Sequence, residues 1–109
     1  MSVLVLGGLA TSLAGCPKFG GRVQATLASV PAGRPVYLVP LYDWDRGGHE
    51  QMLNDEDLRP WRKGTTNAKN VSVFEYSYML VVDCGGGQYQ VEEVAPAKDG
   101  ANDYEIDCP

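Results

Sequence analysis

The chain has 109 residues, of which 44% are hydrophobic and 21% are charged, and such values are typical of one small globular domain. Its formal net charge is −5 at pH 7, which argues against nucleic acid as a partner because nucleic-acid-binding domains are usually basic. All nine Lys and Arg and all fourteen Asp and Glu residues lie at or beyond Lys18. The charge therefore belongs wholly to the part of the chain that follows an uncharged N-terminal segment.

This uncharged segment is apolar from Val3 onward and closes with the string Leu13-Ala14-Gly15-Cys16. It is far shorter than the roughly 20 residues of a transmembrane helix and has the size of the apolar region of a signal peptide. The string resembles the lipobox of bacterial lipoproteins, in which Leu, a small residue, and Gly or Ala precede the Cys. The resemblance implies that Cys16 receives a lipid and becomes the first mature residue. Two or three acyl chains would then hold the domain on a membrane.

The lipobox also predicts where the protein is located. Pro17 follows Cys16, in place of the Asp that retains many such lipoproteins in the inner membrane, so the resemblance implies the outer membrane of a Gram-negative cell, facing the periplasm. We expect a signal segment over 1–15, the lipidated Cys with a short linker over 16–21, and a β-sandwich domain over 22–109. The segment differs from a lipoprotein signal in one respect. The basic residues expected before the apolar stretch are missing, because only Met1 and Ser2 precede it. The alternative is an uncleaved chain in which residues 2–6 form a buried strand and Cys16 is a core thiol.

The chain has three cysteines, which leaves one unpaired in an exported protein. Lipidation of Cys16 would account for the odd one, and Cys84 and Cys108 are then expected to form a disulfide. Two reduced, buried thiols are the alternative. Zinc is disfavoured because no Cys-x-x-Cys spacing occurs and His49 is the one histidine.

Beyond Cys16 the chain is expected to form short strands separated by Gly and Pro turns. Residues 22–29 alternate polar and apolar side chains, and a turn at 30–33 precedes a second apolar stretch over 35–42, which suggests a hairpin-like opening. The longest candidate strand spans 71–83, with an aromatic face expected to line the core. The expected core-facing residues of this strand are Phe74, Tyr76, Tyr78, Leu80 and Val82. Three glycines at 85–87 permit a reversal into a strand over 88–94, and a last strand is expected over 103–107.

The expected disulfide constrains how these strands are arranged. In a flat three-strand meander, Cys84 and Cys108 would lie about 9.6 Å apart, twice the strand spacing of about 4.8 Å. The Cα atoms of a disulfide usually lie within about 7 Å. The last strand should therefore lie beside the 71–83 strand or cross to a facing sheet. We expect an all-β fold, a small antiparallel two-sheet β-sandwich with one long loop between strands.

The start of this domain carries a second resemblance. Gly21-Arg22-Val23, followed by Gly33-Arg34-Pro35-Val36, resembles the openings of prealbumin-like and carboxypeptidase-regulatory-like domains. The likeness covers about the first third of the mature domain. It implies a non-catalytic β-sandwich and says nothing about a ligand.

The segment from Tyr42 to Lys69 is the best candidate for specific binding, because a loop of this length in a compact domain is uncommon unless it is functional. It is expected to fold in part, as a helical turn capped by Asn54 and stopped near Pro60. Its candidate partner or ligand residues are Tyr42, Asp43, Trp44, Asp45, His49, Glu50 and Trp61. The aromatic residues among them could form a platform for a sugar or a protein, or could pack over the open end of the sandwich.

Metal and catalytic interpretations of this loop are weaker. Asp43, Asp45 and Gly48 fit positions 1, 3 and 6 of an EF-hand calcium loop. Gly47 and Asn54 stand at positions 5 and 12, where the loop needs calcium ligands that these residues do not match. His49 and Glu50 could act as base and orienting acid, yet no nucleophile motif accompanies them. We therefore expect no enzyme, no cofactor and no metal.

These observations together predict a membrane-anchored envelope lipoprotein, attached to the membrane through lipid on Cys16. Its non-catalytic β-sandwich would bind an envelope protein or serve as a scaffold. The alternatives are a module that binds a small ligand, sugar or calcium, and an unlipidated assembly or structural protein that keeps its N-terminus.

Overall fold

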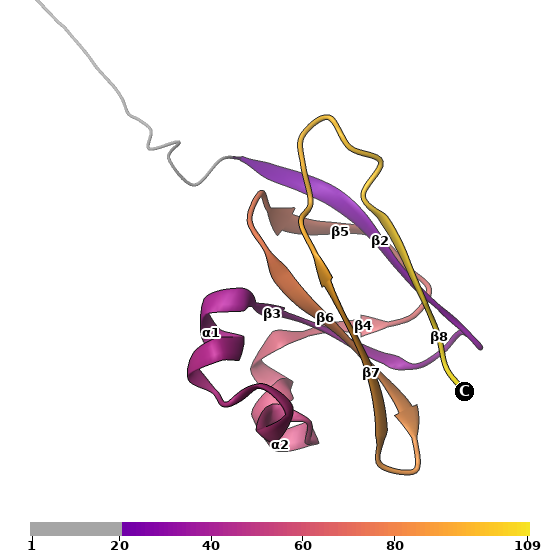
Figure 1. The fold of residues 1–109 in the computed structure, drawn as a ribbon. Helices are drawn as coiled ribbons and strands as arrows, with labels where there is room; N and C mark the ends of the chain where they lie inside the picture. Colours follow the sequence, from indigo (N-terminus) through magenta and orange to yellow (C-terminus); the bar gives the residue numbers. More distant parts are fainter. Residues whose placement is uncertain (1–20) are drawn as a thin grey trace, which may run out of the picture.

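Alternating apolar residues build two β-sheets in the computed structural model, which describes residues 21–109 (Figure 1). The strands are β2 (Arg22–Val30), β3 (Pro35–Pro40), β4 (Arg62–Thr65), β5 (Ala68–Phe74), β6 (Tyr78–Gly85), β7 (Gln88–Val94) and β8 (Asp103–Asp107). One sheet has the order β5-β2-β8 and the other has the order β4-β3-β6-β7. The prediction of a small all-β two-sheet sandwich is confirmed. The lipobox and Cys16 lie outside the described residues.

The strands pair antiparallel with one exception, which the sequence did not predict. β2 pairs antiparallel with β5 but parallel with β8. Parallel neighbours need a long connection that returns the chain to the same end of the sheet. Here the connection between β2 and β8 includes all four strands of the other sheet. Cys108 N donates to Val30 O at 2.8 Å and extends this pairing by one bond.

The main core fills the space between the two sheets. Every second residue of a strand points to the same face, so β2, β3, β5, β6, β7 and β8 all contribute apolar side chains to it. The buried members are Ala25, Leu27, Val36, Leu38, Val73, Tyr78, Leu80, Val82, Val94 and Ile106.

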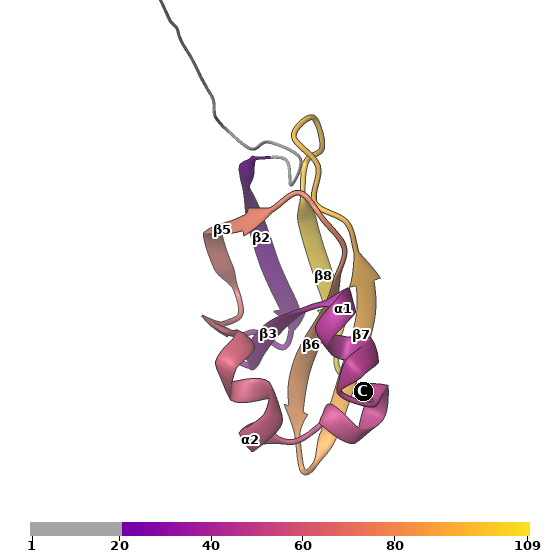
Figure 2. The same cartoon turned by 90° about the vertical axis from the view of Figure 1, so that its left-hand side faces the viewer.

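The four-stranded sheet is buried on both faces. Leu80 and Val82 of β6 face the other sheet, whereas Val81 lies on the opposite face in a second apolar cluster with Tyr37 and Val39 of β3. Short helices cover this outer face, as Figures 1 and 2 show. They are α1 (Leu41–Arg46), η3 (His49–Met52), α2 (Asp55–Leu58) and η4 (Arg59–Trp61). No helix among residues 21–109 is long and apolar enough to span a membrane.

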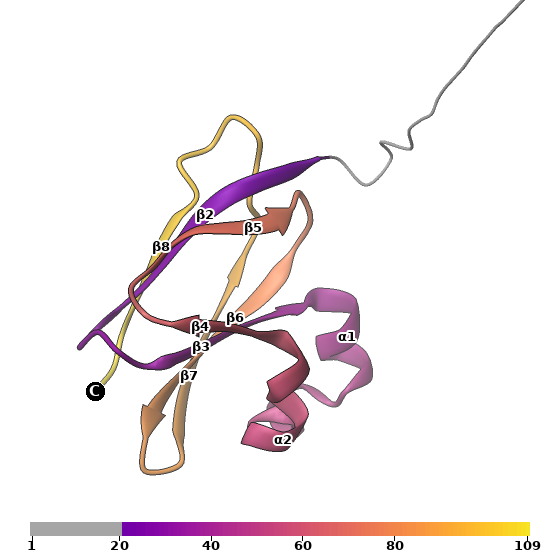
Figure 3. The same cartoon turned by 180° about the vertical axis from the view of Figure 1, so that it is seen from behind.

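Two expectations about strand connections were wrong. Residues 22–42 do not form a hairpin, because β2 and β3 belong to different sheets and the turn between them carries the chain across the sandwich (Figure 3). The single strand expected over 71–83 is two strands, since the chain reverses between Phe74 and Tyr78. Long-range contact helps to hold this reversal: Glu75 N donates to Gly21 O at 3.2 Å. No glycine or proline marks it in the sequence.

The expected disulfide between Cys84 and Cys108 is present, with a Cα–Cα distance of 5.6 Å. Cys84 lies near the end of β6 and Cys108 directly follows β8, so the bond joins the four-stranded sheet to the three-stranded sheet. The last strand therefore crosses to the facing sheet, one of the two arrangements that the spacing argument allowed.

Candidate functional site

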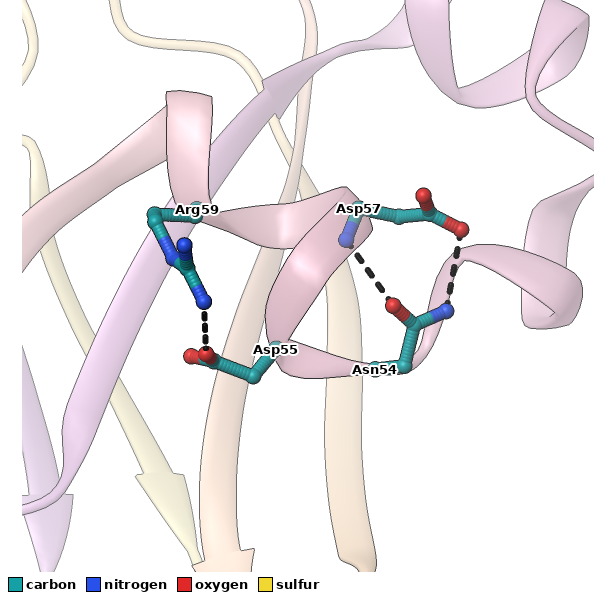
Figure 4. Close-up of polar contacts among 4 residues, drawn as sticks. All are labelled: Asn54, Asp55, Asp57 and Arg59. Atoms are coloured by element: carbon teal, nitrogen blue, oxygen red, sulfur yellow. Dashed lines mark hydrogen bonds and ion pairs between the residues drawn. The ribbon is translucent and has the colours of Figure 1, made fainter.

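The long segment between β3 and β4 is folded, and its local sequence explains why. Asn54 caps α2: its Oδ1 accepts a hydrogen bond from Asp57 N at 2.8 Å, and its Nδ2 donates to Asp57 Oδ2 at 2.9 Å (Figure 4). Pro60 lies in the first turn of η4, where its missing N–H costs no helical hydrogen bond. The predicted helical turn with its Asn54 cap is confirmed.

An exposed ion pair follows the cap. Arg59 Nη2 donates to Asp55 Oδ2 at 2.7 Å (Figure 4). The pair is spaced i, i+4 on the helix surface, and both side chains are more than half exposed. The hydrogen bond from the Arg59 guanidinium lowers the pKa of Asp55, and the same bond raises the pKa of Arg59.

Part of the segment is buried against the sheet. Trp44, Met52 and Leu58 are buried against Tyr37, Val39 and Val81 on the outer face of the four-stranded sheet. Trp44 is only 3% exposed, which agrees with the alternative in which an aromatic residue of this segment packs on the sandwich. The physical reason is that the sheet presents an apolar outer face, and burial of the large Trp44 ring there removes more apolar surface from water than an exposed position would.

The other predicted site residues separate into two groups. Tyr42, Asp43 and Trp61 line one open groove. Asp45 and His49 form an exposed contact of 2.9 Å between Asp45 Oδ1 and His49 Nε2. Asp45, His49 and the exposed Glu50 do not line this groove.

The groove has a wider and a narrower part that share Pro40, Trp61 and Tyr76. The wider part has a volume of about 550 Å³. Its lining residues are Pro40, Leu41, Tyr42, Asp43, Trp61, Tyr76 and Ser77. Tyr42 is 67% exposed and Tyr76 is 39% exposed, so aromatic surface is available to a ligand.

The narrower part has a volume of about 200 Å³ and is a separate hollow beside the wider one, with Arg22 of β2 in its lining. Its lining residues are Arg22, Leu38, Pro40, Trp61, Lys63, Ser72, Val73, Phe74, Tyr76 and Tyr78. The two parts together are called the aromatic groove below.

One wall of the aromatic groove is a column of three rings. The Phe74 and Tyr76 ring centroids are 5.7 Å apart, and those of Tyr76 and Tyr78 are 4.8 Å apart. The Tyr78 hydroxyl accepts a hydrogen bond from Phe74 N at 3.0 Å across the reversal. Burial raises the pKa of Tyr78 to about 12, so this hydroxyl stays neutral at physiological pH.

Arg22 closes the column at its other end. Its guanidinium carbon lies 4.3 Å from the centroid of the Phe74 ring, and its Nη1 donates to Ser72 Oγ at 3.1 Å. A cation over an aromatic face is attracted by the negative charge of that face. The two contacts hold the charged group of Arg22 at the wall of the groove.

The sequence predicted only Tyr42, Asp43 and Trp61 among the residues that line this groove. Arg22, Lys63, Phe74 and Tyr76 were not candidates, and Phe74 and Tyr76 were assigned to the core. The alternation of aromatic residues over 74–78 predicts one face of one strand, but the reversal after Phe74 takes the first two rings out of the core. The sequence offered one signal of the reversal: the strand expected over 71–83 is longer than a typical strand.

The described residues contain no cluster of side chains placed to ligate a metal ion. Residues 21–109 contain no group of three or more His, Cys, Asp or Glu side chains placed to hold a metal ion. Asp43 and Asp45, the first two residues of the calcium pattern, lie on α1, and Asp45 contacts His49 instead. A comparison of the chain with protein-family models, curated proteins and solved structures found no match.

Proposed function

We propose that this protein is a lipid-anchored envelope protein whose non-catalytic β-sandwich binds a protein partner through the aromatic groove. The observation that carries the proposal is the groove itself: Tyr42, Trp61 and Tyr76 line it together, and Tyr42 and Tyr76 are among the few large apolar side chains of the described residues that are exposed. Aromatic residues with a polar tip are enriched at protein interfaces because they supply both apolar area and a hydrogen bond.

The lipobox supports the anchor. Residues Leu13–Cys16 agree with the lipoprotein pattern at each position, and the proposed location is the outer membrane, facing the periplasm. Five residues lie between Cys16 and Arg22, so the chain from one to the other spans at most about 20 Å. Because Arg22 lines the groove, lipidation of Cys16 would keep the groove close to the membrane surface.

The residues of the groove support binding rather than catalysis. Its titratable carboxylate is Asp43, and its hydroxyls belong to tyrosines and serines without a histidine beside them. The exposed His49–Asp45 pair lies outside the groove lining. General acid–base or nucleophilic catalysis needs a base within hydrogen-bond reach of the reacting group. The resemblance to prealbumin-like modules is in keeping with a domain that binds without catalysis.

Intact-mass measurement and membrane fractionation of the natively expressed protein test the anchor. The expected product starts at Cys16, carries acyl chains and sediments with membranes. Replacement of Cys16 by Ser should release it from the membrane. A full-length, unacylated chain with Met1 retained would instead support the unlipidated assembly protein.

Photo-cross-linking in cells tests the groove. A benzophenone side chain at position 42 should give one discrete adduct with an envelope protein. The matched control is position 91 on β7, because Val91 is also exposed at 38% and does not line the groove. Equal adducts from both positions, or none from position 42, would contradict the assignment of the groove as the binding surface.

A further inference from the structure

The charges of the aromatic groove are unlike those of the rest of the domain. The chain has a net charge of −5, yet the narrower part of the groove is lined by the cations Arg22 and Lys63 and by no carboxylate. Glu75, next to Tyr76 in the chain, does not neutralise them by contact. Its two oxygens accept hydrogen bonds from Gly21 N at 3.0 Å and Lys98 N at 2.6 Å. The wider part has the carboxylate Asp43 in its lining, and the guanidinium carbon of Arg46 lies 5.4 Å from the centroid of the neighbouring Tyr42 ring.

The backbone of the groove wall offers few groups to a ligand. Pro40 has no N–H, Leu41 N donates to Ser77 O at 3.0 Å, and Tyr76 N donates to Phe74 O at 2.9 Å. A ligand over the part where the two hollows meet therefore finds no free N–H at Pro40, Leu41 or Tyr76 for main-chain pairing. The aromatic residues of the lining carry polar groups of their own, namely the Tyr42 and Tyr76 hydroxyls and the Trp61 indole N–H. The Tyr42 hydroxyl also accepts a hydrogen bond from Arg46 Nη1 at 3.4 Å.

From these two features we infer that the aromatic groove takes an extended, proline-rich peptide segment of a partner protein, with an acidic residue placed against Arg22 and Lys63. Polyproline II segments have no internal hydrogen bonds and expose their carbonyls. They dock in grooves lined by aromatic side chains, where the ring edges donate to those carbonyls. The inference rests on the proposed function, because it names the chemistry of the partner at the same groove.

Charge complementarity sets the direction of the peptide in the groove. An Asp or Glu side chain at one end meets Arg22, which Phe74 and Ser72 already hold in place. A Lys or Arg side chain at the other end meets Asp43. The prolines lie between, over Pro40, Trp61 and Tyr76, which both parts of the groove share.

Binding of labelled synthetic peptides to the full chain carrying Cys16→Ser tests the inference. The probes are fluorescein-labelled proline-rich peptides with glutamates at one end and arginines at the other, made in both chain directions. A second set has glutamines in place of the glutamates. Fluorescence anisotropy should show tighter binding of one glutamate peptide, by about fivefold over its glutamine counterpart at low salt. The difference should shrink as salt rises.

Variants separate the aromatic and the charged contributions. Tyr42→Ala should weaken binding by about tenfold. Because Tyr42 is highly exposed, this substitution should leave the domain folded. Arg22→Gln should reduce the preference for the glutamate peptide, and Arg22→Gln combined with Lys63→Gln should make the glutamate and glutamine peptides bind alike. Lys69→Gln, which removes an exposed cation of β5 outside the groove, is the matched control and should leave both affinities unchanged.

Three results would overturn the inference: no peptide binds, the glutamate and glutamine peptides bind wild type equally, or Lys69→Gln acts as strongly as Arg22→Gln. Binding of an N-acetylglucosamine oligomer in place of the peptides would also overturn it and would assign the groove to a saccharide. The cross-linking test separates the two proposals. A discrete adduct from position 42 without peptide binding would leave the proposed function in place and reject the peptide class alone.

Discussion

Removal of the Cys84–Cys108 disulfide should cost a large part of the domain's stability. The two cysteines are 24 residues apart in sequence, and closing a loop of that length in the unfolded chain stabilises the fold by about 3 kcal/mol in the chain-entropy model. β8 has one strand neighbour, β2, so the disulfide is also the covalent link that ties this edge strand to the opposite sheet. A domain of this size has roughly 5–15 kcal/mol of stability in total.

Urea unfolding of the Cys84→Ser/Cys108→Ser double variant measures this contribution. With a urea m-value of about 1–3 kcal/mol/M, a loss of about 3 kcal/mol lowers the midpoint by roughly 1–3 M. The control is wild type treated with a reducing agent, which should unfold at the midpoint of the double variant. The reasoning would be refuted if oxidised wild type and the double variant shared one midpoint, or if reduction shifted the double variant as well.

Three further perturbations test separate parts of the fold. Asn54→Ala removes the acceptor of the 2.8 Å bond from Asp57 N and should lower the free energy of unfolding by about 1 kcal/mol in urea. Asn54→Asp should retain most of the cap. Equal losses from the two variants would contradict the capping role. Leu58 is fully buried beneath the short helices. Leu58→Ala therefore opens a cavity there and should lower the free energy of unfolding by about 2–5 kcal/mol. A loss as small as that of an exposed-site variant such as Glu56→Ala would show that the helices are not packed on the sheet.

The third is a titration of stability with alkaline pH. The pKa of Tyr78 in the folded protein, about 12, lies above the ordinary value of 10.0, so the folded state favours the neutral phenol. Its contribution to stability is fully present below pH 10 and is lost as the pH rises toward about 12. Tyr78→Phe should reduce the fall in stability over this range, and an unchanged fall would contradict a buried, neutral Tyr78.

Local signals in the sequence were enough to predict much of the fold. The glycines at 85–87 and the break at Asp99-Gly100 delimit β7 and β8 as observed. Asn54 followed by acidic residues marks the start of α2. The disulfide followed from counting cysteines, and the crossing of the last strand to the facing sheet was one of the two arrangements that it allowed. Each of these depends on residues that are close in sequence or on one covalent constraint.

The features that could not be predicted depend on contacts between distant segments. The reversal after Phe74 has no turn residues of its own and uses Gly21 as a partner. Trp44 is buried because β3 and β6 present an apolar outer face, which alternation alone does not reveal. The aromatic groove combines side chains of β2, α1, η4, β4 and the β5–β6 connection, so only the folded chain brings them together.

The central claim joins the groove to the membrane anchor, and one cross-linking experiment tests both directly. Cells expressing the protein with the benzophenone side chain at position 42 are irradiated with and without the Cys16→Ser substitution, and the adducts are assigned by mass spectrometry. The account predicts an adduct in the membrane fraction, attached to a proline-rich segment of an envelope protein, that is strongly reduced by Cys16→Ser. An unchanged adduct from the Cys16→Ser chain, or no adduct from the anchored chain, would contradict it.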